Sequence, residues 1–193
     1  MEKDLKTYLK YYWLENEYLE KEVKNFFDEH GYLTPEHLFS IIIWKSPRTK
    51  TKIKEYLLRD GSSLVETVHD LTNKIHKAES DQGKLEIILN QEGFGIAMAS
   101  AVLTILYPNN FTVYDYRMSR QLNLNDFKKY RKNGERFEKI SGKGEKDILR
   151  YLEFVEIVKT IACDHQLSLR DCDRVLWAKS WEEELQNLLG SNA

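Results

Sequence analysis

The sequence is poor in the residues that stop helices and that build covalent or metal-bound frameworks. It contains three prolines and two cysteines among 193 residues. Cys163 and Cys172 cannot form a disulfide framework, and they cannot supply the four thiolates of an iron–sulfur cluster. We expect both thiols to be reduced and partly buried in a cytosolic protein. The scarcity of proline leaves room for many helices and little sheet.

Long apolar runs are also missing. No stretch approaches the roughly 20 apolar residues that a membrane span needs. The charged opening, MEKDLKTYLKYYW, lacks the pattern of a secretion signal. We therefore expect a soluble globular protein that does not associate with membranes. Its length allows one large domain, or two interlocked lobes, with a real core.

An excess of positive charge is absent too, because the formal net charge is -2. The distribution of charge is nevertheless uneven. The run from Lys45 to Lys54 holds basic side chains and no acid, and a second basic region covers residues 117–132. Such asymmetry can place a local positive field on a nearly neutral protein, although a solvated helix face is an equally good explanation of either run alone.

Helical periodicity dominates what is present. Thr34 followed by Pro35 marks a helix start, Gly31 fits the end of the opening helix, and Ser168 caps a late one. The nearly apolar helix over residues 37–44 should be buried, and the polar segment 131–144 is expected to be a loop. Helices are predicted over residues 5–29, 37–44, 49–59, 63–77, 83–89, 96–106, 118–130, 145–165, 169–180 and 181–189.

One stretch, GFGIAMASAVLTILYPNNFTVYDYR, concentrates the chemistry of the chain. Gly93 and Gly95 flank Phe94 and can form a tight turn between two helices, because glycine accepts positive φ and lets another backbone approach. The helix that follows offers unpaired N–H groups, a favourable place for a phosphate. Asp115 then stands at the mouth of the next helix. The alternatives are an ordinary helix–helix turn and a helix N-cap; a cap can also hold a catalytic carboxylate still.

These residues resemble the helix-hairpin-helix DNA glycosylases of base excision repair. Gly93-Phe94-Gly95 is similar to the hairpin, residues 99–103 to its second helix, and residues 113–117 to the segment with the catalytic aspartate. The resemblance implies an all-α fold in which one domain, residues 1–193, forms two lobes with both termini in the same lobe. Lobe A would cover residues 33–108, and lobe B residues 1–31 plus 109–193.

The resemblance also implies an activity. The protein would bind duplex DNA and hydrolyse the N-glycosidic bond of a flipped base. Asp115 would stabilise positive charge on the deoxyribose and orient or deprotonate water. Trp44, Tyr114 and Tyr116 are assigned to the substrate pocket, and the turn around Lys45 to the wedge that enters the duplex. The DNA-binding residues would be Gly93, Phe94, Gly95, Lys45, Ser46, Arg48, Lys50 and Arg117.

Three departures from the family pattern matter. Bifunctional members carry a lysine where this chain has Ala97, so lyase chemistry is not expected from the hairpin, although Lys45 is kept as an alternative amine. Gln91 and Glu92 replace the usual Leu-Pro, and Glu92 would weaken phosphate binding. The iron–sulfur signature is absent, so we expect no cofactor and no protein-bound metal; a monovalent cation at the hairpin is left open.

The remaining expectations concern partners and class. We expect a monomer, located in the cytoplasm or associated with the nucleoid. A second class stays open: a non-catalytic DNA-binding or scaffold protein that retains the glycosylase fold. Glu92 and the near-neutral charge favour this class, and the sequence does not reveal which base would be removed.

Several side chains have a structural explanation as good as a functional one. Trp44 and Trp177 fit a core better than a base-stacking site. Tyr114 and Tyr116 would point to opposite sides of an extended link, so that only one reaches a pocket. Arg170 and Asp173 share a helix side with Arg174 and Trp177, which predicts an internal ion-pair network. His69 and His76 are a weak lead for a metal.

Overall fold

The computed structural model describes residues 14–190, apart from the side chains of Asn125 and Asp126. Every regular element in this range is a helix, which confirms the predicted all-α class. Contacts divide the described chain between Leu106 and Tyr107 into a first unit and a second unit. None of the helices in this range combines the length and the hydropathy of a membrane span.

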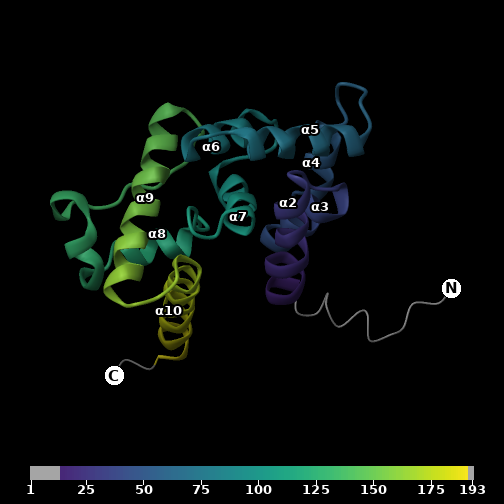
Figure 1. Ribbon diagram of the computed structural model, residues 1–193. Helices are drawn as coiled ribbons and strands as arrows, with labels where there is room; N and C mark the ends of the chain where they lie inside the picture. The colour runs from purple at the N-terminus through teal and green to yellow at the C-terminus, as the bar shows by residue number, and fades with distance from the viewer. Residues whose placement is uncertain (1–13, 191–193) are drawn as a thin grey trace. The chain divides into compact units, whose positions relative to one another are not determined.

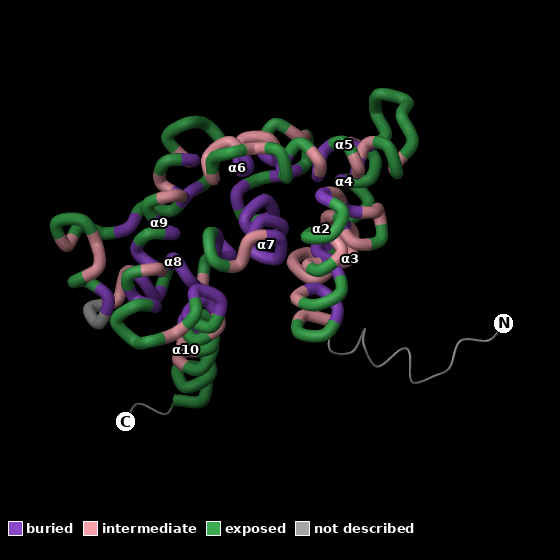
Figure 2. Tube along the Cα trace, in the orientation of Figure 1, coloured by how far each residue is buried: buried purple, intermediate pink, exposed green. Residues whose placement is uncertain are grey.

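The first unit is built around one buried helix (Figure 1). Its elements are η2, a π-helix (Leu14–Val23), and the α-helices α2 (Lys24–His30), α3 (Pro35–Lys45), α4 (Lys50–Leu57), α5 (Leu64–Lys77), α6 (Asp81–Asn90) and α7 (Ile96–Leu106). Every residue of α7 except Ala97 is buried, as the purple tube of Figure 2 shows. A helix that is apolar all round is stable only when other elements surround it. Here α2, α3, α6 and η2 pack against it.

The helix ends of this unit follow the predicted chemistry. The Thr34 hydroxyl accepts the His37 N–H at 3.3 Å, and Pro35 takes the first helical position. Gly31 ends α2 with a φ of 74°. Ser63 and Glu66 form a capping box at the start of α5. The predicted helix start at Thr34 and helix end at Gly31 are therefore confirmed, and the capping box at Ser63 is a further signal that was not predicted. Each of them satisfies N–H or C=O groups that the helix itself leaves unpaired.

The placement of the opening segment differs from the predicted one. The family resemblance implies that residues 1–31 belong with the C-terminal part of the chain in lobe B. Instead η2 and α2 pack on α3 and α7 in the first unit, because their apolar side chains, Leu19, Val23 and Phe27 among them, are buried there. Residues 1–13 and 191–193 lie outside the described residues. The start of the helix predicted at 5–29 therefore lies outside the described residues. The same holds for the two termini, which are predicted to share one lobe.

The predicted burial of α3 holds for one face only. Leu38, Ile41 and Ile42 are buried, whereas Ile43 is 42% exposed. Because successive residues of a helix are rotated by about 100°, a helix at the edge of a unit cannot bury every side of an apolar run.

The second unit consists of helices joined by irregular segments. Its elements are α8 (Tyr116–Leu122), the 3-10 turns η3 (Asn125–Tyr130) and η4 (Lys132–Gly134), α9 (Glu145–Asp164) and α10 (Leu169–Leu189). The helix predicted at 118–130 is therefore shorter and begins earlier, because Asp115 caps it. Most of the segment 131–144 is irregular, as predicted. The long helix α10 packs on both α8 and α9.

The predicted break before Trp181 is wrong, because α10 runs without interruption from Leu169 to Leu189. Ser180, the predicted last residue of the helix, is buried, and the helix continues beyond it. No glycine or proline occurs between Leu169 and Leu189, and Gly190 ends the helix with a φ of 71°.

The two thiols differ in environment, which leads to a first testable prediction. Cys163 is exposed and Cys172 is buried, so the expectation that both are partly buried is wrong. Burial, with a smaller effect of the neighbouring Asp173 charge, raises the pKa of the Cys172 thiol to about 12. At pH 8 a thiol-specific chromophore should therefore label Cys163 alone, because only the thiolate reacts. Cys172 should react after denaturation. Rapid labelling of two thiols in the folded protein would contradict this environment.

Candidate functional site

The turn between α6 and α7 is anchored by its aromatic residue. The Gln91 N–H bonds the Ile88 carbonyl at the end of α6, and the Phe94 N–H bonds the Gln91 carbonyl at 3.3 Å. The Phe94 ring is buried, whereas Gly93 and Gly95 on either side are exposed. Phe94 therefore fixes the turn from inside, and the two glycines present its backbone to the surface.

The two glycines are there for different reasons. Gly93 has a φ of +89°, and a Cβ placed on it would lie 2.6 Å from Cδ2 of Tyr56. A side chain at this position is excluded both by the backbone conformation and by the neighbouring ring. Gly95 does not have a positive φ, and a Cβ there would meet nothing within 4 Å. Internal packing thus explains Gly93 and leaves Gly95 without a structural reason.

Basic side chains from α4 and from the turn after it lie near the Tyr56 ring, the ring that leaves no room for a side chain at Gly93. The Arg59 guanidinium lies 4.5 Å from the centre of the Tyr56 ring, and Nζ of Lys52 lies 5.5 Å from it. Arg59 also forms an exposed ion pair with Glu92. The acid expected to repel a phosphate is therefore already neutralised by a partner. Sequence reasoning missed Tyr56 and Arg59, because their only signal was a shared helix face with Lys52.

The basic turn between α3 and α4 belongs to the first unit. Ser46 ends α3 through its N–H bond to Ile42, and the Lys50 ammonium donates to the Pro47 carbonyl at 3.1 Å. Arg48 is exposed, while Lys45 is half-buried. The structure thus brings the predicted wedge and the glycine turn into one unit. Trp44 is half-buried there, neither a core residue nor a fully exposed one.

Asp115 is the N-cap of α8. Its Oδ1 accepts the N–H groups of Arg117 at 2.9 Å and Met118 at 3.1 Å. The side chain is half-exposed. Two backbone N–H groups that bond one carboxylate oxygen fix the orientation of the side chain. The predicted helix N-cap at Asp115 is therefore confirmed, and the cap leaves a preorganised carboxylate within reach of solvent.

The two tyrosines beside Asp115 point in opposite directions, as expected. Tyr114 is buried, and its hydroxyl accepts the Ile140 N–H at 2.8 Å. Its ring meets the Phe154 ring edge-on, with ring centres 5.2 Å apart. Tyr116 is 58% exposed. This placement argues against Tyr114 as a pocket residue and leaves Tyr116 as the tyrosine that a ligand can touch.

Arg117 lies between aromatic rings. Its guanidinium is 5.1 Å from the centre of Tyr116 and 5.4 Å from that of Trp177, and it pairs with Glu184 of α10. Only 16% of the side chain is exposed. Its charge is therefore largely committed within the second unit, which lowers its value as a phosphate ligand. Trp177 is 43% exposed, so its assignment to the core is wrong. It lies on an exposed side of α10, between the buried residues Leu176 and Ser180.

The predicted internal ion-pair network on α10 is confirmed for one pair only. Arg170 pairs with Asp173 inside the unit, and Arg174 pairs with Asp171 at the surface. Asp173 is only 4% exposed and also accepts the Val113 N–H at 3.3 Å. Burial raises the pKa of the Asp173 carboxyl to about 6, against the lowering effects of Arg170 and the Val113 N–H; the charge of Asp115 adds to the rise.

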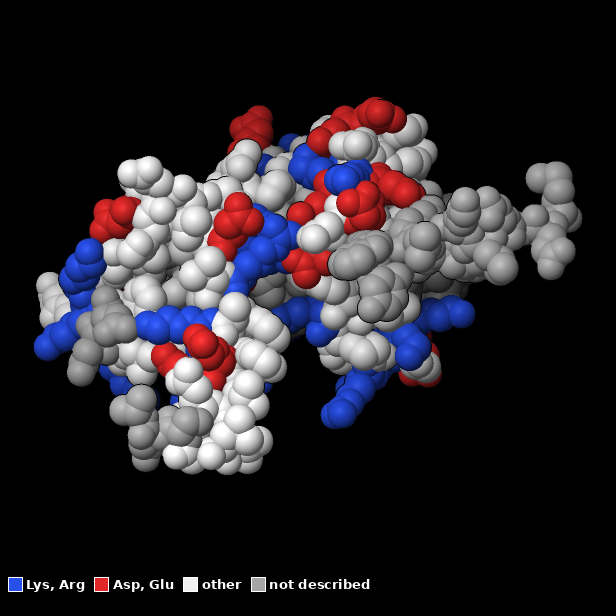
Figure 3. Space-filling model, turned by 90° about the horizontal axis from the view of Figure 1, so that it is seen from below, with Lys and Arg blue, Asp and Glu red and all other residues white. Residues whose placement is uncertain are grey.

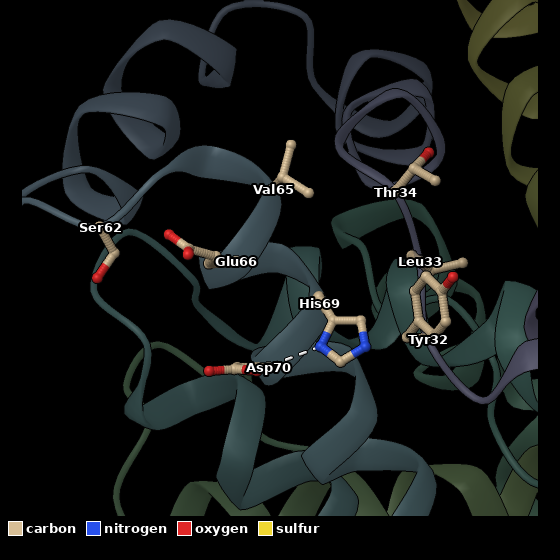
Figure 4. A pocket seen from close by; sticks show the side chains of 8 residues that line it. All are labelled: Tyr32, Leu33, Thr34, Ser62, Val65, Glu66, His69 and Asp70. Atoms are coloured by element: carbon tan, nitrogen blue, oxygen red, sulfur yellow. Dashed lines mark hydrogen bonds and ion pairs between the residues drawn. The ribbon is translucent and has the colours of Figure 1, made fainter.

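A separate hollow of about 480 Å³ lies in the first unit between α5 and the segment before α3. Figure 4 shows Tyr32 and His69 facing each other there, with ring centres 4.4 Å apart, and Asp70 bonded to His69. His76 instead packs on Phe27. No group of three or more His, Cys, Asp or Glu side chains that could hold a metal occurs within the described part of the chain.

Charge of both signs is mixed on the surface. On the face drawn in Figure 3, Lys and Arg side chains lie among Asp and Glu side chains. Within the basic region at residues 117–132, Lys129 pairs with Asp164 and Arg117 pairs with Glu184. The basic region at residues 117–132 is therefore a partly neutralised surface and not a free positive field.

Searches against protein-family models, curated proteins and solved structures found no match to this chain. The function is therefore inferred from the geometry of the glycine turn in the first unit and of Asp115 in the second.

Proposed function

We propose that the protein is a DNA glycosylase of the helix-hairpin-helix type that binds duplex DNA and removes a damaged or mismatched base. The observation that carries the proposal is Asp115, a half-exposed carboxylate oriented by two backbone N–H groups at the start of α8. It follows the glycine turn in the order that the family resemblance requires.

The turn between α6 and α7 would hold the DNA backbone. Gly95 leaves open space over the start of α7, whose first N–H groups have no partner within the helix and favour an anion. Lys52 and Arg59 add positive charge next to Gly93. Phosphate contacts of this kind supply affinity and position without reading the sequence.

Asp115 would act on the sugar of a flipped nucleotide. As the bond between C1′ and the base nitrogen breaks, the base leaves with the electron pair and positive charge develops on the sugar. The carboxylate stabilises that charge, and it accepts a proton from the water that adds to C1′. A preorganised group of this kind contributes about 3–4 kcal/mol to catalysis. Tyr116, exposed next to Asp115, is a candidate contact for the flipped base.

Lyase activity is not part of the proposal. Ala97 is exposed near the start of α7, where bifunctional members carry the attacking lysine. The product would therefore be an abasic site in an uncut strand.

The direct test uses duplexes that each contain one damaged or mismatched base, incubated with the full-length protein and then treated with alkali to reveal abasic sites. Release of one class of base supports the proposal.

A non-catalytic DNA-binding protein is the second candidate, favoured by the partnered charge of Arg117. Duplex binding through the glycine turn, together with no abasic site on any duplex of the panel, would decide for it.

The Arg59–Glu92 pair gives a prediction that tests DNA binding alone. Glu92→Gln should raise duplex affinity about fivefold, since removing a charge next to a phosphate is worth about 1 kcal/mol. The exposed pair itself contributes little to stability. Arg59, no longer paired with Glu92, should also bind a phosphate. The slope of the logarithm of the binding constant against the logarithm of the salt concentration should then become steeper by about 0.9. Fluorescence anisotropy at several salt concentrations measures both quantities.

The matched control is Glu138→Gln, which breaks the Arg150 pair in the second unit and changes the net charge equally. Its effect on affinity should be small. Equal gains in the two variants would mean that net charge, and not the turn, determines binding.

A further inference from the structure

The link that leads to Asp115 is extended and buried, yet it pairs with no strand within the described chain. Phe111, Thr112, Val113 and Tyr114 are all buried. Backbone N–H and C=O groups in such a segment need partners, because an unpaired buried polar group is costly. Side chains of α9 and α10 supply these partners.

The first partner comes from α9. Tyr151 is fully buried, and its hydroxyl donates to the carbonyl oxygen of Thr112 at 2.9 Å. Its ring lies against Phe154, with ring centres 6.1 Å apart. The hydroxyl is therefore held by a packed ring and has little freedom to follow the link if the link moves.

The second partner comes from α10. Asp173 accepts the Val113 N–H at 3.3 Å and pairs with Arg170, and all of these groups are buried. A buried carboxylate is costly unless it is paired and hydrogen-bonded. Arg170 compensates this cost, so a charged acceptor can be kept at this place in the core.

Both partners bind the same peptide group. The carbonyl of Thr112 and the N–H of Val113 belong to one peptide bond, which is planar and rigid. Tyr151 holds its oxygen and Asp173 holds its nitrogen. Two anchors on one plane fix the direction in which the chain leaves it, two residues before Asp115.

We propose that Tyr151 and Asp173 are positioning residues for Asp115, which clamp the Thr112–Val113 peptide and thereby set where the carboxylate stands. This inference rests on the proposed glycosylase function, since a position matters only if Asp115 acts on a substrate. A displacement of about 1 Å at a reacting group can reduce a rate by about 10²-fold. Removing one anchor should therefore slow the chemistry and leave duplex binding by the first unit unchanged.

The test compares two tyrosine hydroxyls of the second unit. Tyr151→Phe removes the bond to Thr112, and Tyr130→Phe removes a bond of the same length, 2.9 Å, to Asp164 at the surface. Amide hydrogen exchange is measured across the full-length protein, and single-turnover excision on the duplex that the wild type cuts. Asp173→Asn, which keeps the shape but loses the charge, serves as a second variant.

For Tyr151→Phe we expect exchange at Val113, Arg117 and Met118 to rise about fivefold or more. Exchange in the middle of α9 and α10 should be unchanged. The single-turnover rate should fall about tenfold with an unchanged KM, and Tyr130→Phe should show neither effect. Asp173→Asn, where it folds, should reproduce the local pattern.

Two results would overturn the proposal. One is unchanged exchange at these amides in Tyr151→Phe. The other is an equal rise throughout α9 and α10, which a merely structural role would give. If the wild type cuts no duplex, the exchange measurement still decides whether the clamp holds Asp115, and only the glycosylase function fails.

Discussion

Asp115→Asn should reduce base excision by about 10²-fold or more while duplex affinity stays within about twofold of the wild type. Asparagine keeps the shape of aspartate, and its carbonyl oxygen can still accept the N–H groups of Arg117 and Met118 that now bond Oδ1. It cannot offer the negative charge that stabilises a positively charged sugar, and it cannot take a proton from water. The loss should therefore appear in the single-turnover rate and not in KM.

The matched control for this variant is Asp171→Asn. Asp171 lies in the first turn of α10 and is exposed, and its Oδ2 accepts the Ser168 hydroxyl at 2.7 Å. Its replacement should leave excision unchanged. The melting temperature of Asp115→Asn should also change little, because the cap survives. Full activity in Asp115→Asn, or inactivity that accompanies unfolding, would count against Asp115 as the catalytic group.

Gly95→Ala should weaken duplex binding about tenfold without destabilising the fold. The new methyl group would meet nothing within 4 Å in the free protein, and the backbone does not need a positive φ. A phosphate held by the N–H groups at the start of α7 would collide with it. A charge-assisted hydrogen bond is worth about 1.5–3 kcal/mol, so one lost contact corresponds to about tenfold or more. Anisotropy titration and thermal melting measure the two effects.

Gly93→Ala, in contrast to Gly95→Ala, should destabilise the fold. Its methyl group would stand 2.6 Å from Tyr56, at a φ of +89° that side chains rarely adopt. We expect the free energy of unfolding to fall by about 1–3 kcal/mol. Destabilisation by Gly95→Ala, or unchanged DNA affinity in a stable Gly95→Ala protein, would remove the turn from the proposed binding surface.

The local features of the candidate site were readable in the sequence because they depend on near neighbours. The helix over 96–106 is confirmed at both ends, since an apolar run between a glycine turn and Pro108 has few alternatives. Asp115 as a cap is confirmed for the same reason, because Asp at a helix start satisfies N–H groups two and three residues away. The alternation of Tyr114 and Tyr116 followed from the two-residue period of an extended link.

What the sequence could not show depends on contacts between distant segments. Tyr114 is the buried tyrosine because Phe154 and the Ile140 N–H meet it, and no local pattern indicates that. Tyr56 and Arg59 meet the glycine turn only after α4 and α6 are both in place. The grouping of η2 with α3 and α7 likewise depends on which apolar face finds which partner, and periodicity alone leaves that choice open.

The clamp on the Thr112–Val113 peptide has a consequence for how such a protein can evolve. The groups that would hold DNA depend on α4, α6 and α7, whereas the position of Asp115 depends on α9 and α10. A single substitution at Tyr151 or Asp173 would therefore slow the proposed chemistry and spare binding. If the protein is the proposed glycosylase, its descendants would lose activity gradually while they keep DNA binding, and the residues at these two positions would indicate how far that loss has gone.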